Sequence, residues 1–248
     1  MIAHSLASPS LVIEVVHNKC ELNVPGYRQI KDWEQRGLTL SEQTISNWRI
    51  KSADWLRPLN ELCRSELMGQ SRIHDDETTY QVLREPGKAA TTKPFLWLIC
   101  STLNAKRPVV YFRYDLRHSG AVAQKLYDGF KGNLQCDGYQ AYGMLPETVS
   151  RSGCWAHVRR KFIETGPTPR RVKGKAKQAL EMINELFKIE KALKNTSLQE
   201  RFAVRQAKSQ PIVEHFFDWL NITNVVEKSA LGKAVHYALG QQKLLTSF

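Results

Sequence analysis

The apolar positions of the first 69 residues recur at helical spacing. A short apolar segment covers residues 11–16, and residues 27–36 keep a helical period. Gly37 follows the second segment, at a position where helices usually end. A further amphipathic stretch covers residues 55–68 and precedes Gly69. Residues 1–69 are therefore expected to form a helical region.

Between these stretches, Ser41 can cap another helix that runs through Trp48. With the helix before Gly37, it has the outline of a helix-turn-helix. In that interpretation, four polar side chains on or near the exposed face can reach base edges or phosphates. They are Gln43, Thr44, Asn47 and Arg49. The alternative is an ordinary helical hairpin that only packs.

The pattern changes after residue 70, where apolar runs become short and turn residues separate them. Residues 95–100 are almost continuously apolar, as in a central strand. The predicted elements are strands over 72–83, 94–102, 109–116, 132–136 and 149–155, with helices over 119–130 and 156–164. Along the chain, the first five elements are three strands, the helix over 119–130 and the strand over 132–136. This β-β-β-α-β order is the core of the ribonuclease-H-like fold.

Helical spacing returns near the end of the chain, over about 175–194, 197–220 and 225–245. A basic stretch, residues 166–177, precedes these helices and is expected to be a flexible connector. The fold class is therefore α/β, a ribonuclease-H-like mixed sheet between two helical regions. The expected domains are residues 1–69, 70–165 and 166–248.

The composition indicates the kind of binding partner and the redox state of the protein. The 248 residues carry a formal net charge of +12, which favours a polyanion such as nucleic acid. The five cysteines form no CxxC pair, which favours a reduced protein. The spacing of Cys154 and His157 suits a metal, but with no second pair no zinc site is expected.

Neither a long apolar run nor a secretion signal is evident in the sequence. No stretch of about 18 apolar residues exists, so no membrane span is expected. Residues 1–6 have no basic segment followed by a continuous apolar one, unlike a secretion signal. A cytoplasmic protein without a membrane partner is expected.

Two aspartates are candidates for chemistry. Asp76 and Asp137 each lie at or near the end of a predicted strand. Carboxylates that converge from separate strands can hold Mg²⁺ or Mn²⁺, ions that prefer oxygen ligands. Such ions support cleavage of phosphodiesters. The alternative is two surface or capping aspartates that share no site.

Basic side chains after the second aspartate are candidates for phosphate contacts. One group is Arg159, Arg160 and Lys161, of which at least two should reach solvent on a helix. The other is Arg170, Arg171, Lys173 and Lys175 in the connector. Binding through either group should weaken with salt. For the first group, the alternative is a packing Trp155 beside solvated basic residues.

Short motifs occur in order over most of the chain. They are Tyr27 to Gln29, Ser41 to Trp48, Leu56 to Leu59, His74 to Thr78, Leu134 to Tyr139, and Gly153 to Phe162. In combination they resemble the transposases of the insertion-sequence 66 family. The Asp-Gly-Tyr and Cys-Trp-Ala-His segments are specific only together.

This resemblance implies a ribonuclease-H-like catalytic domain with two aspartates, a glutamate and Mg²⁺. Asp76 and Asp137 match the two aspartates, and two ions are expected if the site is complete. The implied function is metal-dependent cleavage at transposon ends, followed by strand transfer. The implied partners are DNA of the ends and the target, further copies of the chain on DNA, and accessory proteins of the same element.

The sequence departs from the family in two places. The family's zinc-binding segment and its Asn-Asn-x-x-Glu-Arg segment, which holds the catalytic glutamate, are both missing, so an incomplete copy is expected. Glu147, Glu164 or Glu181 can be considered as substitutes, without a motif that favours one. The alternatives are a catalytically inactive fragment that occupies transposon ends and a general nuclease of the same fold.

Overall fold

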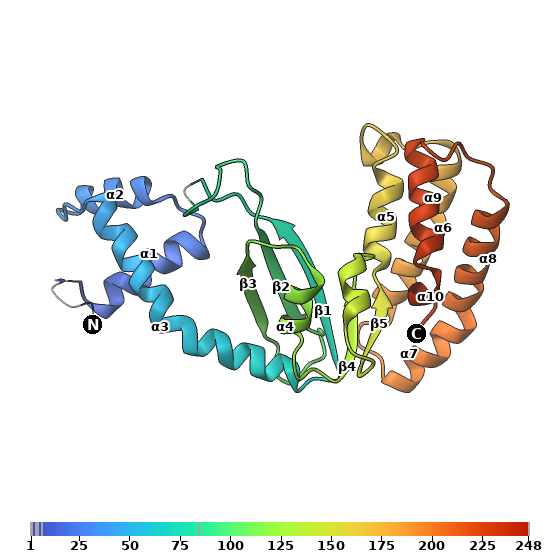
Figure 1. Ribbon diagram of the computed structural model, residues 1–248, viewed down its shortest axis with the longest axis horizontal. Helices are drawn as coiled ribbons and strands as arrows, with labels where there is room; N and C mark the ends of the chain where they lie inside the picture. The colour runs from blue at the N-terminus through green and yellow to red at the C-terminus, as the bar shows by residue number, and fades with distance from the viewer. Residues whose placement is uncertain (1, 3–4, 6, 84, 248) are drawn as a thin grey trace. The chain divides into compact units, whose positions relative to one another are not determined.

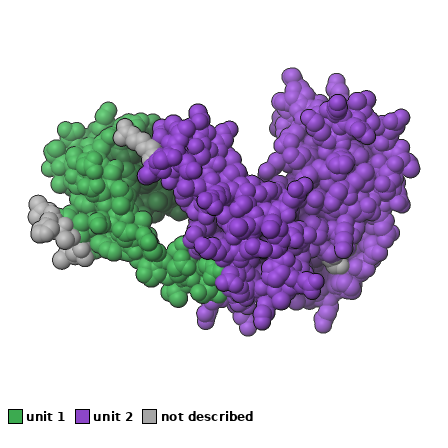
Figure 2. All heavy atoms as spheres, viewed as in Figure 1, with its two compact units in different colours: residues 1–65 green, residues 66–248 purple. Residues whose placement is uncertain are grey.

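The computed structural model describes every residue except 1, 3, 4, 6, 84 and 248. The chain forms two compact units, residues 1–65 and residues 66–248 (Figure 2). The three domains expected from the sequence stay a prediction. Four of the six residues considered for a secretion signal lie outside the described part of the chain.

The first unit is built from three helices, α1 (Pro9–Cys20), α2 (Gly26–Gln35) and α3 (Glu42–Met68). Apolar side chains one helical turn apart form its small core. Val12 and Val15 of α1 meet Ile45 and Trp48 of α3 there. The indole Nε1 of Trp48 donates to the Ser5 hydroxyl at 3.1 Å, so this buried polar group is satisfied.

Helix α3 is longer than the sequence suggested. Its start was expected correctly, because the amide of Thr44 donates to the Ser41 hydroxyl at 3.0 Å. The expected end at Trp48 and the separate helix from Trp55 are wrong, since one helix covers both. No glycine or proline interrupts residues 49–54, and Ser52 bonds back to the Trp48 carbonyl within the helix.

The second unit contains a five-stranded mixed sheet in the order β3-β2-β1-β4-β5 (Figure 1). Its strands are β1 (Arg72–Thr79), β2 (Phe95–Ser101), β3 (Val110–Asp115), β4 (Gly132–Cys136) and β5 (Val149–Gly153). The first three pair antiparallel, while β4 pairs parallel with both β1 and β5. The chain therefore forms a mixed α/β fold.

Strand β1 is shorter than predicted and ends at Thr79, opposite Phe95. The residue that precedes β2 is Pro94, which has no amide hydrogen to extend the ladder. Its carbonyl still accepts from the Tyr80 amide at 2.8 Å, and the chain then leaves the sheet. The expected extension of this strand to Leu83 is wrong for that reason.

One face of the sheet is covered by α4 (Gly120–Leu126) and the 3₁₀ helix η1 (Gln140–Met144). Alternate strand residues such as Ile73, Trp97 and Leu134 are fully buried under them. Helix α4 ends earlier than the predicted Phe130. Gly129 has a φ of 83°, a left-handed conformation that turns the chain away from a helix.

The C-terminal helices form a second layer beside β4 and β5 (Figure 1). They are α5 (Trp155–Ile163), α6 (Gly174–Ala192), α7 (Leu198–Val204), the π-helical turn Arg205–Ser209, α8 (Gln210–Ile222), α9 (Ala230–Gly240) and α10 (Gln242–Leu245). Their shared core includes Phe162, Ile183 and Phe216. Among the described residues, no helix combines the length and apolarity needed to cross a membrane.

Candidate active site

The carboxylate pair, Asp76 and Asp137, is brought together by the parallel pairing of β1 and β4. His74 lies opposite Gln135 in this pairing, so the same register continued by two residues places Asp76 level with Asp137. Asp76 alternates with the buried residues of β1, and its side chain is 49% exposed. Asp137 directly follows Cys136, the last residue of β4. Two aspartates far apart in the sequence thus lie at adjoining strand positions.

His157 of α5 reaches Asp76 from the layer of C-terminal helices. Its Nε2 lies 3.5 Å from Asp76 Oδ1, and the imidazole is mostly buried. The hydrogen bond with Cys154 raises the pKa of His157 most, burial opposes this, and the charges of Asp76 and Asp137 raise the pKa further. The carboxylate pair thus stabilises the protonated imidazole relative to the neutral one.

Asp137 is fixed by its own loop and by α9. The amide of Tyr139 donates to Asp137 Oδ1 at 2.8 Å, which closes a tight turn. The amide of Gly138 donates to the hydroxyl of Tyr237, 99 residues later, at 3.2 Å. A Cβ on Gly138 would lie 2.8 Å from the end of the Gln241 side chain and 3.0 Å from the Tyr237 ring of α9, so the loop and α9 are closely packed here.

A buried network lies behind the carboxylate pair, on the opposite face of β1. The hydroxyl of Tyr142 is hydrogen-bonded to Asp75 and, at 2.6 Å, to Glu77. Burial raises the pKa of Asp75 to about 8. The Tyr142 hydroxyl has one proton, so it can donate only one of these two hydrogen bonds. It donates to Glu77, and a protonated Asp75 carboxyl donates to Tyr142.

His118 completes this network. Its Nε2 lies 3.0 Å from Glu77 Oε1, and its ring stacks on Phe95 at 4.1 Å and on Tyr139 at 3.6 Å. Tyr139 follows Asp137 by two residues and donates its hydroxyl to the His118 carbonyl at 2.7 Å. The network therefore supports the loop that carries Asp137.

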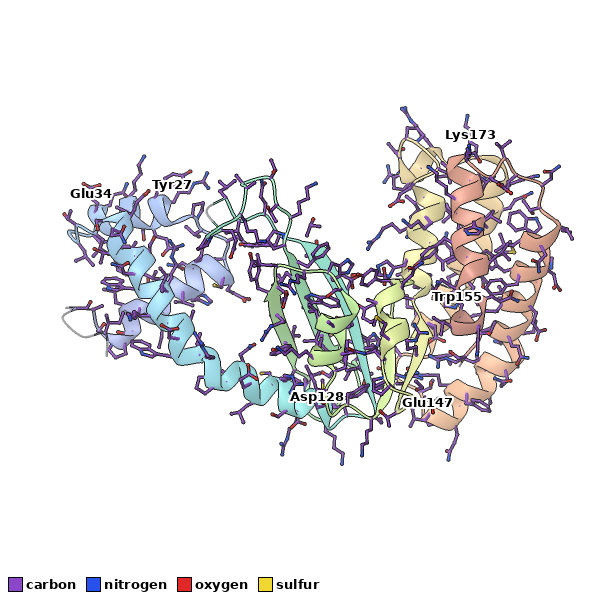
Figure 3. All side chains as sticks on the ribbon, viewed as in Figure 1. Tyr27, Glu34, Asp128, Glu147, Trp155 and Lys173 are labelled. Atoms are coloured by element: carbon purple, nitrogen blue, oxygen red, sulfur yellow. The ribbon has the colours of Figure 1, made fainter. Side chains whose placement is uncertain are left out.

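No third carboxylate joins the pair. Among the described residues, no group of three or more His, Cys, Asp or Glu side chains could hold a metal ion. Glu147 precedes β5 and so lies at the opposite end of the sheet from Asp137 (Figure 3). Glu164 ends α5 beside Lys161, and Glu181 pairs with Lys177 on α6. The structure brings none of these three substitutes to the site.

Glu77 is the acid that sequence analysis missed. Burial raises its pKa most, and the charge of Asp137 adds to the rise, so the two carboxyl groups are close. Its oxygens, however, are hydrogen-bonded to Tyr142 and His118, and its side chain is only 8% exposed. Glu77 therefore orients the neighbouring groups instead of facing a ligand.

The donors of the carboxylate pair suit one hard divalent cation. Carboxylate oxygens are the ligands that Mg²⁺ and Mn²⁺ prefer, and both ions keep several waters when bound. The exposure of Asp76 leaves room for such waters or for a phosphate oxygen. The chemistry of these donors therefore suits such an ion, while the described side chains form no group of three or more His, Cys, Asp or Glu ligands.

The polar residues predicted to read DNA lie near the start of α3. Gln43 and Asn47 are exposed, and the Gln43 amide donates to Asn47 Oδ1 at 2.9 Å. Thr44 shares a hydrogen bond with Ser41. Arg49 is half-buried and donates to the Ser46 hydroxyl at 3.1 Å. Gln43 and Asn47 form the exposed patch, and Arg49 turns back toward its own helix.

The basic residues of α5 divide into two kinds. Arg160 and Lys161 are exposed, as expected of at least two of the three. Arg159 is half-buried and donates to Asn184 Oδ1 of α6 at 2.7 Å, so it joins two helices. Trp155, which packs on Phe216 with ring centroids 5.4 Å apart, belongs to the core, as the alternative interpretation held.

The basic connector contains one short helical turn and one buried residue. Arg170 and Arg171 lie in a short 3₁₀ helix and are exposed. Val172 is buried in the core of the C-terminal helices, so the connector contacts them at this point, and its flexibility stays a prediction. Lys173 precedes α6, at its exposed end (Figure 3), and the Lys175 ammonium donates to the Asn224 carbonyl at 2.7 Å.

Five residues around the carboxylate pair escaped sequence analysis as site residues, namely Glu77, His118, Tyr142, His157 and Tyr237. Glu77 and His157 lie inside motifs noted in the sequence, so their positions offered a signal. The other three reach the site only through long-range contacts. No spacing along the chain indicates such contacts.

The fold and the site together define a class: a mixed α/β protein with an aspartate pair on neighbouring parallel strands. The model of the IS66 transposase family matches residues 4–248, and the chain belongs to that family.

Two curated relatives come from Sinorhizobium fredii. The uncharacterized protein y4jD is 29% identical over 260 residues, which cover 98% of this chain and 50% of the relative. The uncharacterized protein y4qI is 30% identical over 267 residues, which cover 100% of this chain and 48% of the relative. The chain thus spans about half the length of these relatives.

Among solved structures, the chain is similar to the Drosophila P element transposase strand transfer complex. The alignment covers 96% of this chain and 65% of that chain at 13% identity, with a TM-score of 0.37. A similarity of this size carries no argument about fold or function.

Proposed function

We propose that this chain supplies the catalytic part of a DNA transposase with a ribonuclease-H-like fold, which cleaves transposon ends and transfers them to target DNA. One observation carries the proposal: Asp76 lies on β1 and Asp137 directly follows β4, the parallel neighbour of β1, with Asp76 open to solvent. The strand order 3-2-1-4-5, with three antiparallel strands before two parallel ones, supports the fold assignment. Membership of the transposase family supports the process.

In this proposal, Asp76 and Asp137 hold Mg²⁺ or Mn²⁺. When bound, such an ion activates the attacking oxygen and stabilises the leaving oxygen of a phosphodiester. His157 orients Asp76 through its contact at 3.5 Å. Tyr237 holds the Gly138 amide and thereby the loop of Asp137. The C-terminal helices thus position both carboxylates.

In this proposal, DNA is bound by side chains outside the carboxylate pair. Gln43 and Asn47 present amides that can read base edges, while Arg160, Arg170 and Arg171 are exposed cations that suit phosphates. A net charge of +12 favours such a partner. Self-association on DNA and accessory proteins of the same element belong to the proposal through the family resemblance.

A second candidate function is a non-catalytic protein that occupies transposon ends. This candidate is favoured because, among the described residues, no third acidic group joins Asp76 and Asp137. Binding to DNA would then be retained while cleavage would not occur. Both functions use the same basic surfaces and differ only at the carboxylate pair.

The test is a cleavage assay with the purified 248-residue chain, a labelled transposon-end duplex, and Mg²⁺ or Mn²⁺. Asp76→Ala serves as the control, because Asp76 is half exposed and its loss should leave the fold intact. Cleavage by the wild type that disappears in Asp76→Ala supports the catalytic proposal. Binding with no cleavage by the wild type favours the second candidate.

A further inference from the structure

The edge strand β3 carries an exposed apolar surface that the proposed site does not use. Val110, Phe112 and Tyr114 alternate along β3 and are 47%, 53% and 36% exposed. Tyr111, between the first two, is 2% exposed and packs on the other face of the sheet. We call the three exposed side chains the β3 strip.

The β3 strip lies on the same face of the sheet as the carboxylate pair. Phe112 lies opposite Leu98, and Leu98 lies opposite Asp76. Directly opposed residues point to the same face of a sheet, and Asp76 is level with Asp137. A row therefore runs from Asp137, just beyond β4, through Asp76 and Leu98 to Phe112.

The distance along this row suits a nucleic acid strand. Neighbouring strands are about 4.8 Å apart, so Phe112 lies roughly 10 Å from Asp76 between backbones. A phosphodiester held at the carboxylate pair would place a nearby nucleotide of the same strand over Leu98 or Phe112. Aromatic rings bind the faces of bases by stacking, with little dependence on base identity.

The charges around the β3 strip also favour a polyanion. Residues 95–117 contain four basic residues and one acidic residue. Lys106 and Arg107 precede β3, and Arg117 follows it, so exposed cations lie beyond both ends of the strip. The Tyr114 hydroxyl donates to Glu85 at 2.5 Å, which restrains that ring. Aromatic rings between cations are the usual composition of single-strand binding surfaces.

We propose that the β3 strip is a stacking platform for unpaired bases of the DNA strand whose phosphate lies at the carboxylate pair. This inference rests on the proposed function and adds that the DNA substrate is unpaired beside the cleaved bond. Base faces are hidden inside a duplex and exposed in a single strand. The strip therefore favours DNA that is unpaired next to the cleaved bond.

The test compares Phe112→Ala with Phe202→Ala in the full chain, in the presence of Ca²⁺, a cation with oxygen ligands that can occupy the carboxylate pair. Phe202 lies on α7 and is 59% exposed, so its truncation is a matched control. The probes are a short single strand containing 2-aminopurine and the fully paired duplex of the same sequence. Fluorescence titrations give the affinity for each, and circular dichroism checks the fold.

Phe112→Ala should weaken binding of the single strand about tenfold and quench 2-aminopurine less, as expected when a stacking partner is removed. Its affinity for the duplex should change less than twofold. Phe112→Trp should retain single-strand binding, and Phe202→Ala should behave like the wild type.

Unchanged single-strand affinity in Phe112→Ala, or an equal loss for both DNA forms, would overturn the platform. So would a change in oligomeric state with unchanged DNA affinity, which would make the strip a protein contact. A wild type that binds neither probe overturns the platform together with the proposed DNA function. A wild type that cleaves DNA, beside a Phe112→Ala variant that binds normally, overturns the platform alone.

Discussion

At the scale of single residues, β1 separates two kinds of carboxyl group by alternation. Asp76 faces the layer with His157, whereas Asp75 and Glu77 face the buried network around Tyr142. The sequence shows only a run of three acids. These acids differ in their access to water. Asp75 is buried and keeps its proton near neutral pH, while Asp76 stays accessible.

Asp137→Asn should abolish Mg²⁺-dependent cleavage and change DNA affinity by less than about twofold. The amide keeps the shape and can accept the Tyr139 hydrogen bond but carries no charge for a cation. Cleavage and gel-shift assays on the same preparation provide the comparison. An equal loss of binding and cleavage would count against a metal role.

Tyr237→Phe should lower the affinity for Mn²⁺ several-fold while leaving the melting temperature within about 4 °C of the wild type. The variant lacks only the hydroxyl that accepts from the Gly138 amide. Calorimetric titration with Mn²⁺ measures the affinity, and Tyr111→Phe in the sheet is the matched control. An unchanged affinity in a wild type that binds Mn²⁺ would exclude the positioning role of Tyr237.

The buried carboxyl of Asp75 makes stability depend on pH. Its pKa is raised to about 8, so between about pH 4 and pH 8 the unfolded state has released this proton while the folded state retains it. The unfolded state then binds fewer protons, and the free energy of unfolding falls as pH rises through this window. Above about pH 8 the contribution becomes constant.

Asp75→Asn should therefore flatten the decline of the melting temperature between pH 5 and pH 8, measured by calorimetry in EDTA. A gain of about 1 kcal/mol at pH 8 would raise the melting temperature by roughly 2–4 °C. Glu66→Gln, at an exposed ion pair with Arg107, is the control and should leave the slope unchanged. A variant with the wild-type slope would show that Asp75 titrates normally.

At the scale of elements, the type of a helix or strand was easier to predict from the sequence than the residues where it is interrupted. Strand β4 has its predicted bounds, Gly132–Cys136, because an apolar centre lies between a glycine and the Asp-Gly turn. Helix α3 was predicted as two helices, although residues 49–54 contain no glycine or proline and one helix runs from Glu42 to Met68. The carboxylate pair was predictable from motifs, whereas the roles of Tyr142 and Tyr237 depend on packing that no local pattern encodes.

The contact between the β4 loop and α9 gives a prediction at this scale. Gly138→Ala should destabilise the second unit by about 1–3 kcal/mol, since the added Cβ would meet Gln241 at 2.8 Å and the Tyr237 ring at 3.0 Å. Combining it with Gln241→Ala should recover part of this stability. Urea unfolding of both single variants and the double variant measures the coupling, and strict additivity would contradict the close approach.

At the scale of the whole molecule, the carboxylate pair lies in a chain with a formal net charge of +12. The cations on α5 and before α6 lie on elements that pack in the same C-terminal layer. The carboxylate pair lies at the side of the sheet that α5 reaches through His157. Arg160 and Lys161 therefore lie on the same helix as the His157 that contacts Asp76.

Replacing Arg170, Arg171, Lys173 and Lys175 with Ala should lower DNA affinity to a similar extent for all sequences. The salt slope of log affinity should flatten by about 0.9 for each phosphate that the variant no longer neutralises. Fluorescence anisotropy over a range of salt concentrations measures both effects. Replacing Lys188, Lys191, Lys194 and Lys208 removes the same charge elsewhere and is the control. An identical slope in the two quadruple variants would exclude a specific role of the connector.

The hydrogen bond between Gly138 and Tyr237 has a consequence for the order of folding. The residues it joins are 99 positions apart, so a ribosome must release α9 before the loop of Asp137 can reach its final geometry. The sheet up to β4 can pair earlier, with the loop still unrestrained. Under the proposed function, full metal affinity should accordingly appear only after Tyr237 has left the ribosome.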